Sequence, residues 1–200
     1  MDNGLEHIQP VGLELVDDLA AEAGSVRHGN QDPAAGRDVV GAEAPDLLDH
    51  LQGRRVTVYT NNGHVVNRNY PEGIDIQLFG GTLRSNHIMT GDLTLRALMD
   101  IHVNKAFLGC TGISPEGEIL CGIPSELGIN ETMIVHASQY FILADHSKIG
   151  RSGTFASFLL EKKGCIITDN LASMTVTDRL RNSGMEVIRV SEEFFRNGVI

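Results

Sequence analysis

The sequence contains no tryptophan, and only 5% of its 200 residues are aromatic. Proteins that bind single-stranded nucleic acid use aromatic side chains to stack on bases, so this composition argues against that function. No apolar run approaches the roughly 20 residues that a membrane-spanning helix needs. The N-terminus also lacks the basic segment and apolar stretch of a secretory signal. We therefore expect a cytoplasmic protein with no membrane partner.

Cysteine is scarce as well. The three cysteines, Cys110, Cys121 and Cys165, are an odd number and include no C-x-x-C pair, which favours a reduced compartment over a disulfide framework or a zinc site. Cys110 has no evident activating partner, so we expect it to be a buried packing residue. The eight histidines show neither H-x-x-x-H nor H-E-x-x-H spacing. We accordingly predict no metal site and no cofactor.

Positive charge is in short supply in the first quarter of the chain. Residues 1–50 contain 11 Asp and Glu but only two Arg, so they carry nine of the ten net negative charges. Residues 51–200 are close to neutral, with 15 acidic and 14 basic residues. A DNA-binding surface needs a basic patch. We therefore expect that this chain does not bind DNA by itself.

Short apolar runs alternate with helical patterns along most of the chain. Strands are expected at Asp38–Gly41, Arg55–Tyr59, Ile74–Phe79, Ala106–Gly109, Tyr140–Ala144, Cys165–Thr168 and Met185–Val190. Helices are expected at Val11–Ala23, at Glu43–Gln52, from Thr90 as N-cap to His102, between the fourth and fifth strands, and from Asp169–Asn170 to Asn182. This alternation predicts an α/β domain over residues 11–200, with a mostly parallel sheet and helices on both faces. Residues 1–10 lack periodicity and are expected to be disordered.

Four of the expected strands end in small, polar or charged residues. The four stretches are TNNG at 60–63, GGTLR at 80–84, CTG at 110–112 and DHSK at 145–148. The ends of parallel strands meet at one edge of the sheet, where ligands bind in open α/β folds. Glycine allows backbone N–H groups to approach a ligand closely, and Lys148 and Arg84 add positive charge. The sequence therefore predicts an anion site, and phosphate is the anion that it fits best.

The same motifs carry a resemblance to a known family. GGTLR, the later TGDLTLRAL, KAFLGCTGISPEG and LADHSKIGRSG followed by IITDN resemble the C-terminal sensor domain of DeoR-type transcriptional regulators, over roughly residues 38–170. The resemblance implies the fold of ribose-5-phosphate isomerase, glucosamine-6-phosphate deaminase and the CoA transferases. It also implies a phosphorylated sugar or related metabolite as effector, and a homo-oligomer, dimer or tetramer. In this family the effector usually controls DNA binding by an N-terminal winged helix-turn-helix.

The strand ends and the resemblance together select a set of candidate ligand contacts. Asn61 and Asn62 are suited to sugar hydroxyls, Lys148 and Arg84 to phosphate, and the resemblance places Glu126 at the ligand cavity. The candidate ligand-binding residues are Thr60, Asn61, Asn62, Gly80, Gly81, Arg84, Thr111, Glu126 and Lys148.

Several residues at these strand ends also have a purely structural explanation. Arg84 either contacts the ligand or pairs with a neighbouring helix, and Asn61 either binds a sugar or caps the helix that follows it. Glu126 is equally suited to the first turn of a helix, where the dipole favours a carboxylate. Asp145 and His146 would together suit acid–base chemistry, but the aspartate equally well caps the turn.

Two departures from the family pattern leave other functions open. No winged helix-turn-helix is present, so the chain is either an isolated effector domain or a stand-alone relative. The family's first phosphate loop is usually a glycine followed by threonines, whereas residues 41–45 read GAEAP and contain a carboxylate. The alternatives are a sugar-phosphate isomerase or deaminase and a degenerate oligomerisation domain. The loop Cys110–Ile113 lacks the acidic residue or histidine that the related enzymes carry, so we expect no catalysis.

Overall fold

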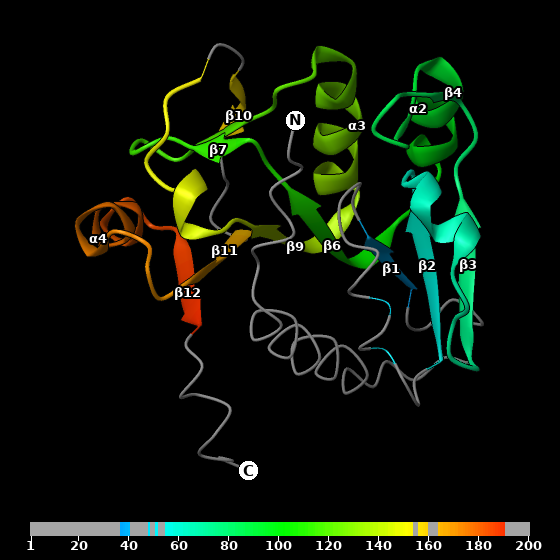
Figure 1. The fold of residues 1–200 in the computed structure, drawn as a ribbon, viewed down its shortest axis with the longest axis horizontal. Coiled ribbons are helices and arrows are strands. Elements are labelled where there is room, and N and C mark those ends of the chain that lie inside the picture. Colours follow the sequence, from blue (N-terminus) through cyan, green and yellow to red (C-terminus); the bar gives the residue numbers. More distant parts are fainter. Residues whose placement is uncertain are drawn as a thin grey trace.

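A seven-stranded sheet, in which every neighbouring pair of strands is parallel, lies at the centre of the protein (Figure 1). The computed structural model describes residues 37–40, 48, 51, 55–153, 156–159 and 164–190. In order across the sheet the strands are β12 (Glu186–Val190), β11 (Gly164–Asp169), β9 (Ala137–Leu143), β6 (Val103–Gly109), β1 (Arg37–Val40), β2 (Val56–Thr60) and β3 (Ile74–Leu78). This confirms the predicted fold class.

The strand order reverses at the centre of the sheet. From β1 the chain adds β2 and β3 on one side, and from β6 it adds β9, β11 and β12 on the other. β1 and β6 are neighbours, with Val39 paired to Ala106. Open parallel sheets bind their ligands at such a reversal, beyond the carboxyl ends of the strands. The topology therefore directs attention to the edge at which the four motifs were expected.

The central strands are apolar on both faces of the sheet, as buried parallel strands are. Ala106, Leu108 and Ile142 belong to one core cluster, while Phe107 and Phe141 belong to a second and stack at 5.0 Å between ring centroids. Because successive residues of a strand point to opposite faces, the two clusters are the two sides of the sheet. The second cluster also contains Leu48, Leu51 and Val65, the last from the 3-10 helix η3 (Gly63–Asn67).

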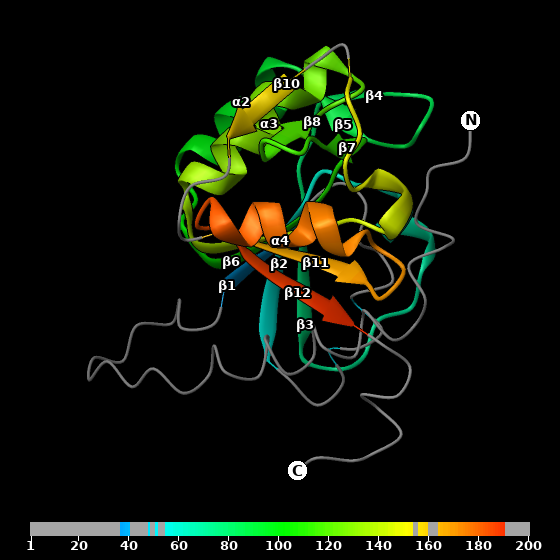
Figure 2. The ribbon, with the colours of Figure 1, turned by 90° about the vertical axis from the view of Figure 1, so that its left-hand side faces the viewer.

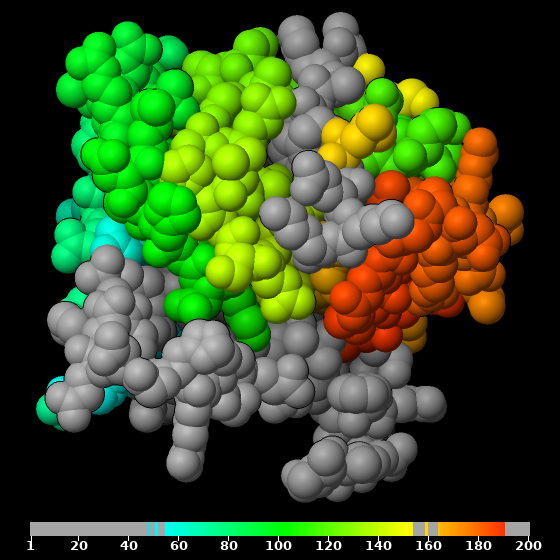
Figure 3. Space-filling model, turned by 180° about the vertical axis from the view of Figure 1, so that it is seen from behind, coloured from blue at the N-terminus to red at the C-terminus, as the bar shows by residue number. Residues whose placement is uncertain are grey.

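Three α-helices cover the first face: α2 (Asp92–Met99), α3 (Pro124–Val135) and α4 (Met174–Asn182). Each contributes buried apolar side chains to the first core cluster, such as Leu98, Met133 and Leu180. Figure 2 shows the three helices on the same side of the sheet. Seen from behind, the surfaces of α2, α3 and α4 follow one another across the molecule (Figure 3). None of the helices in the described part of the chain is long and apolar enough to cross a membrane.

Two small sheets were not predicted. β4 (Thr82–Leu83) and β5 (Met89–Thr90) form an antiparallel hairpin, and β7 (Gly112–Ile113), β8 (Glu118–Leu120) and β10 (Ala156–Leu159) form a three-stranded sheet. The chain between β6 and β9 is therefore not simply helical, because β7 and β8 precede α3. Strands this short carry no readable alternation of apolar and polar residues.

Two expected helix starts were wrong. Thr90 is not an N-cap, because it pairs with Thr82 in β5, and Gly91 takes the N-cap position of a helix that ends at Met99 rather than near His102. Asp169 does not open a helix either: it ends β11, and α4 begins five residues later at Met174. The Asp169 carboxylate accepts the Leu171 N–H in a turn, which competes with helix initiation, whereas the Thr90 hydroxyl bonds across the hairpin to the Thr82 carbonyl.

Other predictions hold, and some lie outside the described residues. Gly184, with a positive φ of 95°, follows the end of α4 as expected of a helix-terminating glycine. The expected disorder of residues 1–10, the helix at Val11–Ala23 and the loop at 41–45 lie outside the described residues, as does most of the helix expected at Glu43–Gln52.

Candidate ligand-binding site

The four predicted motifs follow the carboxyl ends of β2, β3, β6 and β9. Since these strands are all parallel members of one sheet, the four loops lie along the same edge, as predicted. The motifs at the ends of β2 and β6 stand on either side of β1, where the strand order reverses. Residues from separate parts of the chain are thereby brought to one rim.

The loop after β2 is buried and held by its own polar side chains. The Thr60 hydroxyl accepts the Asn62 N–H at 3.0 Å, and the Asn62 side chain accepts the His64 N–H at 2.9 Å. Asn62 is therefore the N-cap of η3. The alternative role predicted for Asn61, as cap of the following helix, was wrong, because the cap is one residue later.

Asn61 makes contacts of a different kind. It is 0% exposed, and its side-chain amide donates to the Met89 carbonyl at 3.1 Å, which attaches the loop to β5. Its side-chain oxygen is buried without a hydrogen-bond partner in the described part of the chain. An unpaired buried acceptor costs free energy, so a donor that reached it would stabilise the folded protein.

The two glycines after β3 have different surroundings. The Gly80 carbonyl accepts the Thr94 hydroxyl at 2.8 Å, and no atom lies within 4 Å of a Cβ built on this glycine. Gly81 has a φ of 151°, and a Cβ there would lie 2.2 Å from the Thr94 hydroxyl and 2.7 Å from the Thr90 carbonyl. Close packing against α2 therefore explains why position 81 is a glycine.

The β4–β5 hairpin brings Arg84 close to α3. The Arg84 Nε donates to the Thr90 hydroxyl at 2.9 Å, and Asn86 donates to the Glu126 carboxylate at 3.1 Å. Burial raises the pKa of Glu126 above its usual value of 4.5, although the Asn86 hydrogen bond and the Arg84 charge partly oppose the rise. Arg84 thus interacts electrostatically with Glu126 of α3. Pairing with a neighbouring helix was one of the two roles predicted for Arg84.

A pocket lies between the end of β6, β8 and α3. It contains about 370 Å³ of space, including solvent at its mouth, and is lined by Gly109, Cys110, Thr111, Ile119, Leu120, Cys121, Glu126 and Asn130. Thr111 and Glu126, two predicted residues far apart in sequence, therefore share one pocket. The Thr111 hydroxyl also accepts the Gly122 N–H at 2.8 Å. Cys110 is buried, as predicted.

Asn130 is a lining residue that the sequence reasoning missed. It follows Glu126 by four residues on α3, and side chains at this spacing lie on the same face of a helix. Once Glu126 was a candidate, this spacing would have identified Asn130. Asn86 had no comparable signal, because its bond to Glu126 joins positions 40 residues apart.

Lys148 is the most unusual of the predicted residues. Lys148 is only 7% exposed and is the last residue of the 3-10 helix η4 (His146–Lys148). Its side-chain amine makes no hydrogen bond or ion pair to any part of the chain that the structure describes. A buried charge without a partner is costly, and an anion bound beside it would offset the cost.

The turn that carries Lys148 packs against the loop that carries Thr111. Ile149 forms a parallel bridge with Ile113 of β7, and the Gly150 N–H donates to the Ile113 carbonyl at 2.8 Å. β7 begins directly after Thr111. The structure therefore places the Lys148 turn next to the strand that leads out of the pocket.

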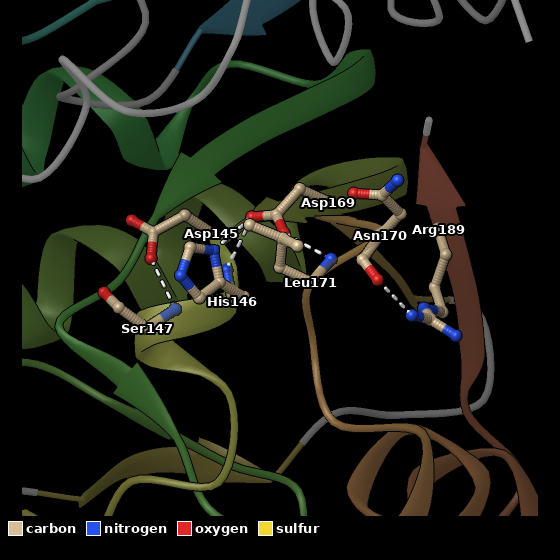
Figure 4. A network of polar contacts seen from close by, with 7 residues as sticks. All are labelled: Asp145, His146, Ser147, Asp169, Asn170, Leu171 and Arg189. Atoms are coloured by element: carbon tan, nitrogen blue, oxygen red, sulfur yellow. Dashed lines mark hydrogen bonds and ion pairs between the residues drawn. The ribbon is translucent and has the colours of Figure 1, made fainter. Parts of the chain in front are cut away.

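A polar network joins the ends of β9, β11 and β12 (Figure 4). Asp145 accepts the Ser147 N–H at 2.7 Å and so caps the turn, while His146 contacts Asp169 rather than Asp145. At the outer end of the network Arg189 donates to the Asn170 carbonyl. Of the two explanations offered for Asp145, capping of the turn is therefore the one that the structure shows, and His146 contacts Asp169 instead.

Asp169 collects most of the bonds in this network. One of its carboxylate oxygens accepts the His146 N–H at 2.7 Å and lies 3.0 Å from the His146 ring nitrogen, and the other accepts the Leu171 N–H at 2.8 Å. Burial tends to raise the pKa of Asp169, but the bonds from His146 and Leu171 outweigh it and hold the pKa below its usual value. The carboxylate is therefore charged at neutral pH.

The candidate residues thus form four groups on one edge of the sheet. The loop Thr60–Asn62 is attached to β5, and Gly80 and Gly81 pack near α2. Arg84, Thr111 and Glu126 lie around α3 and the pocket, and Lys148 lies beside β7. In the part of the chain that the structure describes, no three His, Cys, Asp or Glu side chains form a group that could hold a metal ion.

Comparison with known proteins decides the family. A family model described as the DeoR C terminal sensor domain matches residues 40–170, more than half of the chain. The chain belongs to the DeoR family. The resemblance that the motifs carry is therefore confirmed, over nearly the range from which it was inferred.

Three relatives show how far the similarity extends. The HTH-type transcriptional repressor GlcR of Bacillus subtilis is 32% identical over 146 residues, which cover 72% of this chain and 56% of that protein. The glycerol-3-phosphate regulon repressor of Haemophilus influenzae is 31% identical over 110 residues, or 55% of this chain and 42% of that protein. The putative aga operon transcriptional repressor of Escherichia coli O157:H7 is 29% identical over 139 residues, with coverages of 68% and 52%. The chain spans about half the length of the curated relatives it matches.

Proposed function

We propose that this DeoR sensor domain binds a phosphorylated sugar or a sugar-derived metabolite, and that binding controls DNA recognition by a separate domain of a transcriptional repressor. The observation that carries the proposal is the buried Lys148, which has no anionic partner in the described part of the chain. A phosphate group bound there would supply the missing negative charge.

The remaining candidates divide into groups suited to the two ends of such a ligand. We assign Lys148 to the phosphate, whereas Arg84 lies close to Glu126 and therefore belongs to the other end of the ligand. Glu126 and Asn130 are hydrogen-bond acceptors suited to hydroxyl groups. The two sets stand on different elements of the rim, so one extended molecule would contact both.

The relatives support this class of effector and a regulatory role. All three are named as repressors. One of them is named for the glycerol-3-phosphate regulon, and glycerol 3-phosphate is a phosphorylated metabolite. We place the protein in the cytoplasm, as a homo-oligomer of two or four chains. The effector would shift the balance between oligomer arrangements by no more than the difference in its affinity for them.

A thermal-shift screen in buffer free of phosphate and sulfate tests the proposal. The panel contains sugar phosphates, the matching free sugars, sugar alcohols and inorganic phosphate. A ligand present at about 100 times its dissociation constant stabilises the folded state by about 2.7 kcal/mol. We expect a sugar phosphate to raise the melting temperature and its free sugar not to.

Two variants make the screen specific. Lys148→Met keeps an aliphatic side chain but removes the charge, and should abolish the shift. Arg96→Met, which removes a charge from the exposed face of α2, should leave it intact. A shift that survives in Lys148→Met would remove the basis of the proposal, and no shift with any compound would favour an oligomerisation domain.

We also propose that the domain is not an enzyme. The loop Cys110–Ile113 contributes no acidic or histidine side chain, and His146 is engaged by Asp169. Incubation with ribose-5-phosphate and with glucosamine-6-phosphate should therefore leave both compounds unchanged. Isomerised or deaminated product, detected by NMR, would favour the isomerase or deaminase alternative.

A further inference from the structure

We propose that Asp169 is a positioning residue of the ligand site: it holds His146, and through it the turn that places Lys148. This inference rests on the proposed role of Lys148 in binding phosphate. Asp169 belongs to β11 and Lys148 to the turn after β9, so the contact joins two neighbouring strands of the sheet. Figure 4 shows His146 between Asp145 and Asp169.

The Asp169 carboxylate contacts both the backbone and the ring of His146, and we call this contact the clamp. Oδ2 of Asp169 lies 2.7 Å from the backbone nitrogen of His146 and 3.0 Å from its ring Nδ1. A single carboxylate oxygen therefore fixes both the main chain and the side chain of this residue. The other oxygen accepts the Leu171 N–H at 2.8 Å, which fixes the carboxylate itself.

The turn is restrained at two further points. Asp145 accepts the Ser147 N–H at 2.7 Å, and Lys148 donates its own N–H to the Asp145 carbonyl at 3.0 Å. On the other side, Ile149 is bridged to Ile113 of β7. Contacts within the turn, to β7 and to β11 therefore restrain the backbone around Lys148, and Asp169 supplies the contact from β11 to His146.

The contact between the two side chains contributes little to folding. The side chains of His146 and Asp169 are 44% and 20% exposed, and ion pairs that solvent reaches are weak, so the stability that Asp169 supplies comes from its bonds to backbone N–H groups. Ligand affinity depends far more steeply on position, because a charge that must be ordered on binding loses affinity that a preorganised charge retains. We therefore expect the loss of Asp169 to affect phosphate binding more than folding.

Inorganic phosphate, titrated by ³¹P NMR, is the probe, since it tests the Lys148 end of the site alone. Asp169→Asn should weaken phosphate binding by about tenfold, measured at a temperature at which the variant is fully folded. Hydrogen exchange at the His146 amide should become faster in Asp169→Asn.

Asp178→Asn is the matched control. It removes the same charge from a carboxylate that also accepts a hydrogen bond, from Arg181 on α4. It should bind phosphate as the wild type does. If Asp169→Asn does not fold, His146→Ala provides a second test: it keeps the backbone donor, loses the ring contact and should weaken binding by a smaller factor.

The outcomes separate this inference from the proposed function. Wild-type affinity in Asp169→Asn, or equal losses in Asp169→Asn and Asp178→Asn, would overturn the positioning role while leaving Lys148 as the phosphate ligand. If the wild type binds neither phosphate nor any sugar phosphate, both proposals fail together.

Discussion

At the scale of single residues, Glu126 is subject to opposing effects. Burial raises the pKa of its carboxyl group, whereas the Asn86 hydrogen bond and the Arg84 charge lower it, and the net result is a raised pKa. The folded protein therefore holds this proton more tightly than the unfolded chain does. Stability from this group is present at low pH and is lost as the pH rises from 4.5 through the raised pKa.

Glu126→Gln should consequently stabilise the protein without ligand at pH 7, because it removes a charge that burial disfavours while keeping an oxygen for Asn86. Near pH 4 the difference in melting temperature should vanish, since the wild-type carboxyl group is then protonated. Glu131→Gln, at an exposed position of the same helix, serves as control and should change little. A melting temperature of Glu126→Gln at or below that of the wild type at pH 7 would contradict this interpretation.

The same substitution should weaken binding of a sugar phosphate. A carboxylate accepts hydrogen bonds from hydroxyl groups more strongly than a neutral amide does. Residues of a binding site often lower folding stability while they raise ligand affinity, so replacing one can stabilise the protein and weaken binding.

At the scale of elements, the packing of the loop after β3 on α2 allows a comparison of two adjacent glycines. Gly81→Ala should destabilise the protein by more than about 1 kcal/mol, because the new Cβ would collide with Thr90 and Thr94 at a positive φ. Gly80→Ala, one residue earlier, meets no atom and should be close to neutral. Urea unfolding midpoints measure both. Equal midpoints for the two variants would show that packing does not explain Gly81.

The elements also show which parts of the fold were predictable. The second halves of β6 and β9 are continuous apolar runs, so these parts of the strands were evident from the sequence, and the βα alternation indicated the parallel sheet. The first halves contain polar residues and were not predicted. The hairpin β4–β5 and the strands β7 and β8 were missed because they are two or three residues long and are held by tertiary contacts. Thr90 and Asp169 were assigned to helix starts because their side chains suit caps and turns equally well.

The candidate site also contains residues that the sequence predicted and residues that it missed. Residues that directly follow strands, such as Arg84, Thr111 and Lys148, were identified from topology and the family motifs. Asn86 and Asp169 act through contacts that span 40 and 23 positions, and no local pattern encodes such contacts. Only the folded chain reveals that they support residues already selected.

At the scale of the whole molecule, the sheet brings distant loops to one edge around the strand-order reversal between β1 and β6. The rim combines cationic side chains with hydrogen-bond acceptors, and it contains a buried lysine whose side chain lacks an anionic partner in the described residues. Fold and family therefore agree on a DeoR sensor domain, and the chemistry of the rim supports the proposal that its effector is a small anionic metabolite.

A crystal structure with the sugar phosphate that gives the largest thermal shift tests this conclusion most directly. We predict a phosphate oxygen within hydrogen-bond distance of the Lys148 Nζ, with the hydroxyl groups of the sugar directed toward Glu126 and Asn130. A phosphate group bound elsewhere, with Lys148 still free of any anion, would contradict the proposed function.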